Sequence, residues 1–227
     1  MATLRRSSIG CRAFPSRKSA RSSEAVRILA IETATAACSV ALIDNGTLVA
    51  ERHEIVGRGH AERLIPMIAE LPDGGRADII LVDCGPGSFT GVRVGLAAAR
   101  ALGLAWGVAV RGFSSLALVA AAAAKEGGSV AVALTGGHGE LFVQRFAADP
   151  LAPLAPLASL PPELAAAQIS EPRIHGSGAA ALIAARGFGE AQDALPRAAD
   201  LLLLPEALAS LAPAPLYGRA PDAKLPS

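Results

Sequence analysis

The stretch Asp78–Trp106 reads DIILVDCGPGSFTGVRVGLAAARALGLAW, and its pattern decides the fold class of the chain. The apolar, β-branched run at 79–82 is typical of a buried parallel strand. Gly85-Pro86-Gly87 ends that run, because glycine tolerates positive φ and proline fixes φ and lacks an amide donor. Either Ser88 or Thr90 can cap a following helix by accepting hydrogen bonds from its first free amides. A strand, a glycine turn and a helix in this order predict an α/β fold.

Small residues recur at every fourth position of the predicted helix, at Gly91, Gly95, Ala99, Gly103 and Gly107. They form one stripe along the helix surface. Each glycine costs roughly 1 kcal/mol of intrinsic helix stability, so a closely packed neighbour has to offset that cost. The neighbour is either a partner protein or another element of the same lobe.

The glycine turn has the arrangement that commonly binds a phosphate, but its sequence matches neither of two well-defined motifs. A Walker A loop needs a lysine and the spacing G-x-x-x-x-G-K-[ST], which are absent here. The G-x-S-x-G elbow of serine hydrolases is absent as well, since Pro86 and Thr90 stand where its glycines belong. The turn is therefore either a phosphate-binding loop or a tight turn with a purely structural role.

Residues 1–26 hold six basic side chains against one acid, Glu24, and are rich in serine. This composition resembles an organelle transit peptide. The interpretation that we favour is a disordered extension, or a start codon placed too early with the protein beginning near Val26. The remaining chain has 15 basic and 19 acidic side chains, a formal net charge of −4. That balance lacks the basic surface expected of a protein that binds nucleic acid unaided.

The three cysteines, Cys11, Cys38 and Cys84, are widely spaced and form no C-x-x-C pair. This usage is typical of a protein from a reducing cytoplasm, and it argues against a disulfide framework and a zinc site. The longest uncharged apolar run, at 113–124, is too short to cross a membrane. We expect a cytoplasmic protein that makes no contact with a membrane.

The rest of the chain reads as two related α/β lobes, 27–112 and 113–227, of which the second is smaller and less regular. In the first lobe we expect strands at 28–31, 38–43, 48–51 and 79–82, and helices at 60–71 and from Gly91 to about 106. In the second we expect helices at 115–125, 163–168, 179–186 and 198–211, strands at 130–134, 141–146 and 173–175, and a linker at 150–162.

Few polar residues stand out as candidates for a site. Glu32 ends the first predicted strand and either orients a phosphate or metal ion or, as we favour, accepts hydrogen bonds from nearby amides. Thr135 occupies the equivalent position in the second lobe. Arg93 either contacts an anion or forms a salt bridge with Asp83 or Asp78. No histidine has a second ligand at helical spacing, so we expect no metal site.

The sequence also resembles a known family, the TsaB (YeaZ) family. The motifs that carry the resemblance are ILAIETAT from Ile28, ACSVAL from Ala37, GRGHAERLIP from Gly57, GPGSFTGVRVG from Gly85, GELF from Gly139, PLYGR from Pro215 and PDAK from Pro221. The resemblance covers the chain from Ile28 onward and implies two actin-like, RNase-H-like (ASKHA) lobes. It places the family's motif loop at Glu32, Thr33, Gly85, Pro86, Gly87, Ser88, Phe89, Thr90, Gly91 and Arg93.

By this resemblance the protein takes part in making threonylcarbamoyladenosine in tRNA, as a non-catalytic scaffold that binds and activates the transferase TsaD. The ATPase TsaE joins the pair, tRNA is reached through the complex, and the free protein can form a homodimer. ATP, Mg²⁺ and threonylcarbamoyl-adenylate are used by the complex, and no cofactor belongs to this chain. The implied partner interface comprises His60, Leu64, Met67, Ile68, Leu71, Gly95, Leu96, Ala99 and Gly103.

Two departures from related proteins support a chain without its own catalytic centre. ATP-hydrolysing relatives of this fold have acidic residues at the turns of both lobes, whereas the second turn here is Thr135-Gly136-Gly137. The paired histidines of TsaD have no counterpart, since Leu64 follows His60 at the required spacing.

Two other functions remain open at the level of the sequence. One is an ATP-binding enzyme similar to a sugar kinase. The other is a serine hydrolase with Ser88 as nucleophile and His138 or His175 as base, although no orienting acid is evident.

Overall fold

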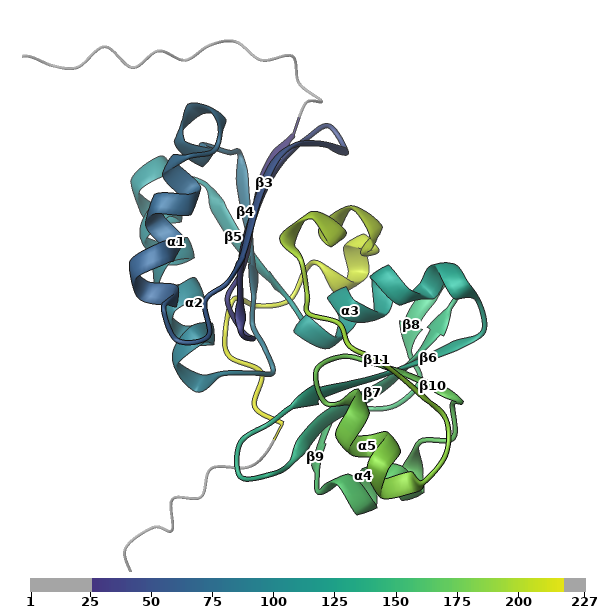
Figure 1. The fold of residues 1–227 in the computed structure, drawn as a ribbon. Helices are drawn as coiled ribbons and strands as arrows, with labels where there is room; N and C mark the ends of the chain where they lie inside the picture. Colours follow the sequence, from purple (N-terminus) through teal and green to yellow (C-terminus); the bar gives the residue numbers. More distant parts are fainter. Residues whose placement is uncertain (1–25, 219–227) are drawn as a thin grey trace, which may run out of the picture.

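The computed structural model describes residues 26–218, which form two α/β lobes connected by helix α3 (Figure 1). The extension predicted at 1–26 lies outside the described residues except for its last residue, and so does the end of the predicted C-terminal segment. Among the described residues, no helix has the length and apolar character needed to cross a membrane.

The first lobe is built on a five-stranded sheet in the order β3-β2-β1-β4-β5. Its strands are β1 (Arg27–Glu32), β2 (Ala37–Asp44), β3 (Thr47–Ile55), β4 (Ile79–Asp83) and β5 (Ala109–Phe113). The first three strands are antiparallel, and β4 and β5 add to β1 in parallel. Asn45 and Gly46 both have positive φ, as the tight turn between β2 and β3 requires.

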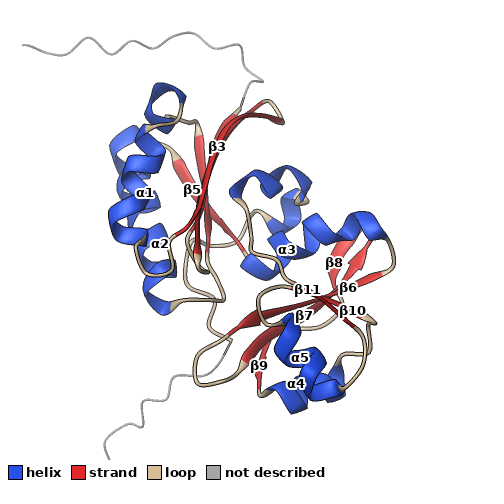
Figure 2. Cartoon of the chain, in the orientation of Figure 1, coloured by secondary structure: helices blue, strands red, loops and turns tan. Residues whose placement is uncertain are grey.

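Helices α1 (His60–Ala69) and α2 (Phe89–Trp106) cover the face of this sheet that is turned away from the second lobe (Figure 2). A short 3-10 helix, η1 (Pro72–Gly75), leads from α1 toward β4. The opposite face of the sheet packs against α3 (Ser115–Ala123) and the 3-10 helices η3 (Ala198–Leu203) and η4 (Glu206–Leu208). Apolar residues on both faces of β1 and β4 are buried, as the continuous apolar run at 79–82 predicted for β4.

The second lobe repeats this strand arrangement with mostly shorter strands. Strands β8, β7, β6, β10 and β11 take the places of β3, β2, β1, β4 and β5. Its sheet runs β11-β10-β6-β7-β8, and β9 also pairs with β7. The strands are β6 (Ser129–Thr135), β7 (Leu141–Ala148), β8 (Leu151–Pro153), β9 (Ala158–Leu160), β10 (Arg173–His175) and β11 (Glu190–Gln192). Helices α4 (Pro162–Gln168) and α5 (Ala179–Arg186) cover its outer face, and η2 (Ala124–Glu126) follows α3.

The observed elements differ from the expected ones in three places. The segment 150–162, expected to be a linker, contains β8 and β9. The strands β5 and β11, which close the parallel side of each sheet, were not expected. The helix predicted at 198–211, with Pro205 interrupting it, is instead the two 3-10 helices η3 and η4, which are separated at Pro205 as expected.

The C-terminal segment returns to the first lobe. The Ala198 amide donates a hydrogen bond to Ser39 Oγ (3.0 Å) on β2. Gly112 and Leu211 form an isolated antiparallel bridge, and the Leu216 amide donates to the Cys84 carbonyl (2.8 Å). Residues 197–216 therefore hold the C-terminal end of the described chain against the first lobe, next to the cleft described below.

Candidate functional site

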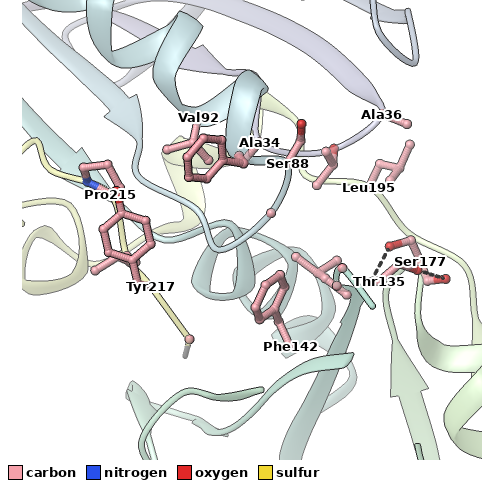
Figure 3. Close-up of a pocket in the computed structure, with 18 of the residues that line it drawn as sticks. Ala34, Ala36, Ser88, Val92, Thr135, Phe142, Ser177, Leu195, Pro215 and Tyr217 are labelled. Carbon is pink, nitrogen blue, oxygen red and sulfur yellow. Dashed lines mark hydrogen bonds between the residues drawn. The ribbon is translucent and has the colours of Figure 1, made fainter. Parts of the chain in front are cut away.

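A cleft of about 610 Å³ opens between the two lobes (Figure 3). One wall comes from the turn after β1, from the turn before α2 and from the first turns of α2. The other comes from the ends of β6 and β7 and from the turn that holds Ser177. The residues that line it are Ala34, Thr35, Ala36, Gly57, Gly87, Ser88, Phe89, Val92, Arg93, Leu134, Thr135, Gly136, Gly137, Phe142, Ser177, Leu195, Pro215, Leu216, Tyr217 and Gly218.

The motif loop joins the turn after β1 to the turn before α2. The Ser88 amide donates to the Ala34 carbonyl (2.6 Å), and Thr33 Oγ1 donates to the Gly91 carbonyl (2.8 Å). Ser88 caps α2, because its Oγ accepts a hydrogen bond from the Gly91 amide (3.2 Å). Of the two caps considered from the sequence, Ser88 is therefore the one used.

The glycines of the motif allow the backbones to approach closely. A Cβ atom on Gly87 would lie 2.0 Å from the Ala34 carbonyl oxygen, and one on Gly91 would lie 2.0 Å from the Thr33 carbonyl oxygen. From Gly91 to Gly103 the stripe of small residues therefore packs against its own lobe, one of the two neighbours expected from the sequence, whereas Gly107 is exposed. The glycine turn thus lets the start of α2 pack directly against the turn after β1, and we call this contact the joint between α2 and β1.

Glu32 lies beneath this joint and does not line the cleft. Its side chain is fully buried, and its Oε1 accepts hydrogen bonds from the amides of Ala34 (2.8 Å) and Thr35 (3.3 Å). The favoured interpretation, a carboxylate that binds nearby amides, is thus confirmed. Burial and the neighbouring Asp83 carboxyl raise the pKa of Glu32 well above its ordinary value.

Arg93 lies at the mouth of the cleft and does not form the salt bridge with Asp83 or Asp78 that was one of its two expected roles. Its guanidinium group stacks on Phe89, 3.2 Å from the ring centre. Its Nη2 also donates to the Tyr217 hydroxyl (3.5 Å). The arginine is exposed, so its charge stays available to an anion in the cleft.

The second lobe contributes a neutral wall. Thr135 Oγ1 donates to the Ser177 carbonyl (3.1 Å), and Ser177 Oγ accepts from the Thr135 amide (3.2 Å). No acidic residue, histidine or cysteine is among the described residues that line the cleft. His138 does not line it, and His175 lines a separate cavity, so neither candidate base shares the cleft with Ser88.

The nine residues of the implied partner interface need a correction, because all of them face the interior of their own lobe. Leu64, Met67 and Ala99 are 0% exposed, and the other six are also buried. His60 Nε2 hydrogen-bonds to the Ala37 carbonyl (2.9 Å). A partner that docks on α1 and α2 can reach only their outer surface, where Leu104 is 87% exposed.

Sequence reasoning missed several residues of the site. Phe142 and Tyr217 belong to the GELF and PLYGR motifs, but their role was not assigned: both contribute rings to the cleft, and Leu195 reaches it from the segment before η3. The partnership of Asp83 with Glu32 was also missed. A signal for that pair was present, because each acid follows an apolar strand of the same predicted sheet.

Comparisons with known proteins agree with this architecture. The family model described as TsaD, tRNA N6-adenosine threonylcarbamoyltransferase, matches residues 51–149. The chain is 36% identical over 131 residues to the tRNA threonylcarbamoyladenosine biosynthesis protein TsaB of Escherichia coli (strain K12), covering 55% of this chain and 56% of that protein. TsaB of Haemophilus influenzae is 41% identical over 101 residues, 42% of each chain. The chain thus matches about half the length of these curated relatives.

Solved structures extend the similarity over most of the chain. YeaZ from Pseudomonas aeruginosa superposes with a TM-score of 0.71 at 29% identity, covering 85% of this chain and 99% of that one. A second Pseudomonas aeruginosa structure, of a protein with similarity to peptidase YEAZ, gives a TM-score of 0.73 at 29% identity, with coverages of 86% and 100%. The predicted fold class, two actin-like, RNase-H-like lobes of which the second is less regular, is confirmed.

Proposed function

Because this chain belongs to the TsaB (YeaZ) family, we propose that it is the non-catalytic activating subunit of the complex that adds a threonylcarbamoyl group to the tRNA adenosine beside the anticodon. In this role it binds and stimulates a TsaD-type transferase in the cytoplasm. A TsaE-type ATPase joins the pair, and tRNA is reached through the complex.

The observation that carries this proposal is the lining of the interlobe cleft. Within residues 26–218 the cleft offers hydroxyls, one arginine and three aromatic rings, but no carboxylate or imidazole that could hold a metal ion or move a proton. Glu32, which precedes the turn that lines the cleft, is fully buried and bonded to backbone amides. Such a site supports a scaffold better than an independent kinase or hydrolase.

The outer surface of α1 and α2 is the surface that we assign to the transferase. Both helices lie on the side of the first lobe turned away from the second lobe (Figure 1). Ile65 on α1 is 51% exposed and Leu104 on α2 is 87% exposed, next to small residues such as Ala97 and Ala101. Exposed apolar side chains between small ones suit helix-to-helix docking.

The test is reconstituted tRNA threonylcarbamoylation with purified TsaD-type and TsaE-type proteins, ATP, Mg²⁺ and threonylcarbamoyl-adenylate, with and without this protein. We expect modification to depend on it. Leu104→Asp should weaken binding of the transferase by about tenfold or more, because a charge would be buried at the interface. Leu164→Asp is the matched control, since Leu164 on α4 is 54% exposed but lies on the second lobe.

Equal modification without the protein would refute the activating role. Equal loss of binding in Leu104→Asp and Leu164→Asp would refute the assigned surface while leaving the activating role in place. Calorimetric titration with Mg-ATP addresses the kinase-like alternative, for which this proposal expects no binding heat from the isolated chain.

A further inference from the structure

Two buried carboxyl groups lie side by side beneath the floor of the cleft, and the proposed function uses neither of them. Glu32 is the last residue of β1 and Asp83 is the last residue of β4. These strands pair in parallel with Ile31 opposite Val82, so the two acids occupy the next register position and point to the same side of the sheet. Both side chains are 0% exposed.

One oxygen of each carboxyl group is fully engaged. Glu32 Oε1 accepts hydrogen bonds from the amides of Ala34 and Thr35, in the turn after β1. Asp83 Oδ1 accepts from the Gly85 amide (2.7 Å), in the turn before α2, and from Ser115 Oγ (2.9 Å) at the start of α3. The pair therefore binds the two turns that meet at the motif loop, and it also binds the helix between the lobes.

The other oxygen of each group, Glu32 Oε2 and Asp83 Oδ2, is buried and has no hydrogen-bond partner. Leaving an ionised carboxylate oxygen dry and unpaired is costly, and two such charges on neighbouring strands also repel each other. A single proton between the two groups removes one charge and supplies a donor. Pairs of carboxyl groups in other proteins are known to behave in this way.

No basic side chain among the described residues neutralises the pair. Within residues 26–218 neither carboxyl group forms an ion pair. The titratable groups coupled electrostatically to the pair are the thiols of Cys38 on β2 and Cys84 beside Asp83. The pKa of each thiol is raised to about 12, by burial first and by these carboxyl groups second. Both thiols therefore stay neutral and add no charge.

We propose that Glu32 and Asp83 share one proton between their free oxygens, and that this proton makes the motif loop a pH-dependent conformational lock. With the proton in place the pair carries one negative charge and holds both turns. Once the proton leaves, two adjacent charges push β1 and β4 apart at the joint where the Ser88 amide binds the Ala34 carbonyl. Loss of the proton thus loosens the wall of the cleft that the first lobe provides.

The pKa directions agree with this arrangement. Burial raises the pKa of Asp83 to about 7, and burial together with Asp83 raises the pKa of Glu32 well above its ordinary value. Both folded-state pKa values lie above those of the unfolded chain, which are about 4. The stabilising contribution is therefore complete below about pH 4 and is lost as the pH rises through about 7.

The first test is an NMR titration of the wild-type protein that follows its backbone amides. The amides of Ala34, Thr35 and Gly85 should shift together with one midpoint of about pH 7, because they donate hydrogen bonds to Glu32 Oε1 and Asp83 Oδ1, one oxygen of each carboxyl group. Asp200→Asn is the matched control: burial also raises the pKa of Asp200 on η3, but neither Glu32 nor Asp83 is among the charges that shift it, so the three amides should titrate unchanged. Three amides that do not titrate, or that titrate independently, would overturn the proposal.

The second test is urea unfolding of wild type, Glu32→Gln and Asp200→Asn at about pH 5.5 and about pH 8.5. One extra proton held over about 1.5 pH units predicts that the unfolding equilibrium constant of wild type rises about thirtyfold through this pair. In Glu32→Gln the side-chain amide can donate to the free Asp83 oxygen in place of that proton, so the rise should be smaller. Asp200→Asn should retain the wild-type difference. Parallel pH dependences in wild type and Glu32→Gln would refute the shared proton, and if Glu32→Gln does not fold, the wild-type titration decides alone.

Discussion

Position 91 requires glycine, because a main-chain atom of the neighbouring turn occupies the space that a Cβ would need. The Thr33 carbonyl oxygen would lie 2.0 Å from any Cβ at this position. Thr33 cannot shift easily, because its Oγ1 donates a buried hydrogen bond to the Gly91 carbonyl oxygen. The repeat of small residues was evident in the sequence, but the partner that it packs against was not.

Gly91→Ala should lower the free energy of unfolding by about 3 kcal/mol, because overpacking has to push α2 away from β1. Urea unfolding at constant pH measures the change. Gly137→Ala is the control, since nothing lies within 4 Å of a Cβ there and the change should stay within about 0.5 kcal/mol. Equal losses in the two variants would contradict the role of close packing.

At the scale of single elements, α2 depends on its first turn. The motif turn ends at Ser88, whose side chain satisfies the Gly91 amide, while Thr90 makes no such contact and is exposed. Most strands and helices of the first lobe could be predicted from their local sequence patterns. The short strands β5 and β11 could not, because β5 contains Arg111 and Gly112 and β11 is only three residues long.

Ser88→Ala should destabilise the protein by about 1 kcal/mol, the usual cost of a lost N-cap, and lower Tm by roughly 2–4 °C for a chain of this size. Differential scanning calorimetry measures the shift, and Thr90→Ala should leave Tm nearly unchanged. The same Ser88→Ala protein should activate the transferase normally. Loss of an esterase activity on this substitution would instead favour the hydrolase alternative.

At the scale of the whole molecule, α3 unites the two lobes. It is buried on all sides, and one core cluster joins residues of both sheets around it, such as Leu81 from β4 and Phe146 from β7. A core shared in this way predicts that the lobes unfold together. The turns that form the two walls of the cleft are therefore anchored to one shared hydrophobic core.

Leu118→Ala on α3 should lower the free energy of unfolding by about 2–5 kcal/mol, because Leu118 is 0% exposed and its loss leaves a cavity. Urea unfolding should give coincident curves for the fluorescence of Trp106 in the first lobe and for far-UV circular dichroism. The exposed Leu202→Ala is the control and should change little. Two separate transitions would show that the lobes unfold independently.

The sequence by itself determined an α/β fold with two related lobes and a glycine turn before α2, because strand and helix periodicity and turn signals are local properties. The actin-like fold and the motif loop followed from the family resemblance. It also indicated that Glu32 binds nearby amides, since a carboxylate two residues from a turn reaches those amides in any fold of this kind. Only the tertiary structure decided what faces what. The direction of the α1 and α2 side chains, the rings in the cleft and the pairing of Glu32 with Asp83 depend on contacts between residues far apart in the chain, and the pattern of one segment carries no record of them.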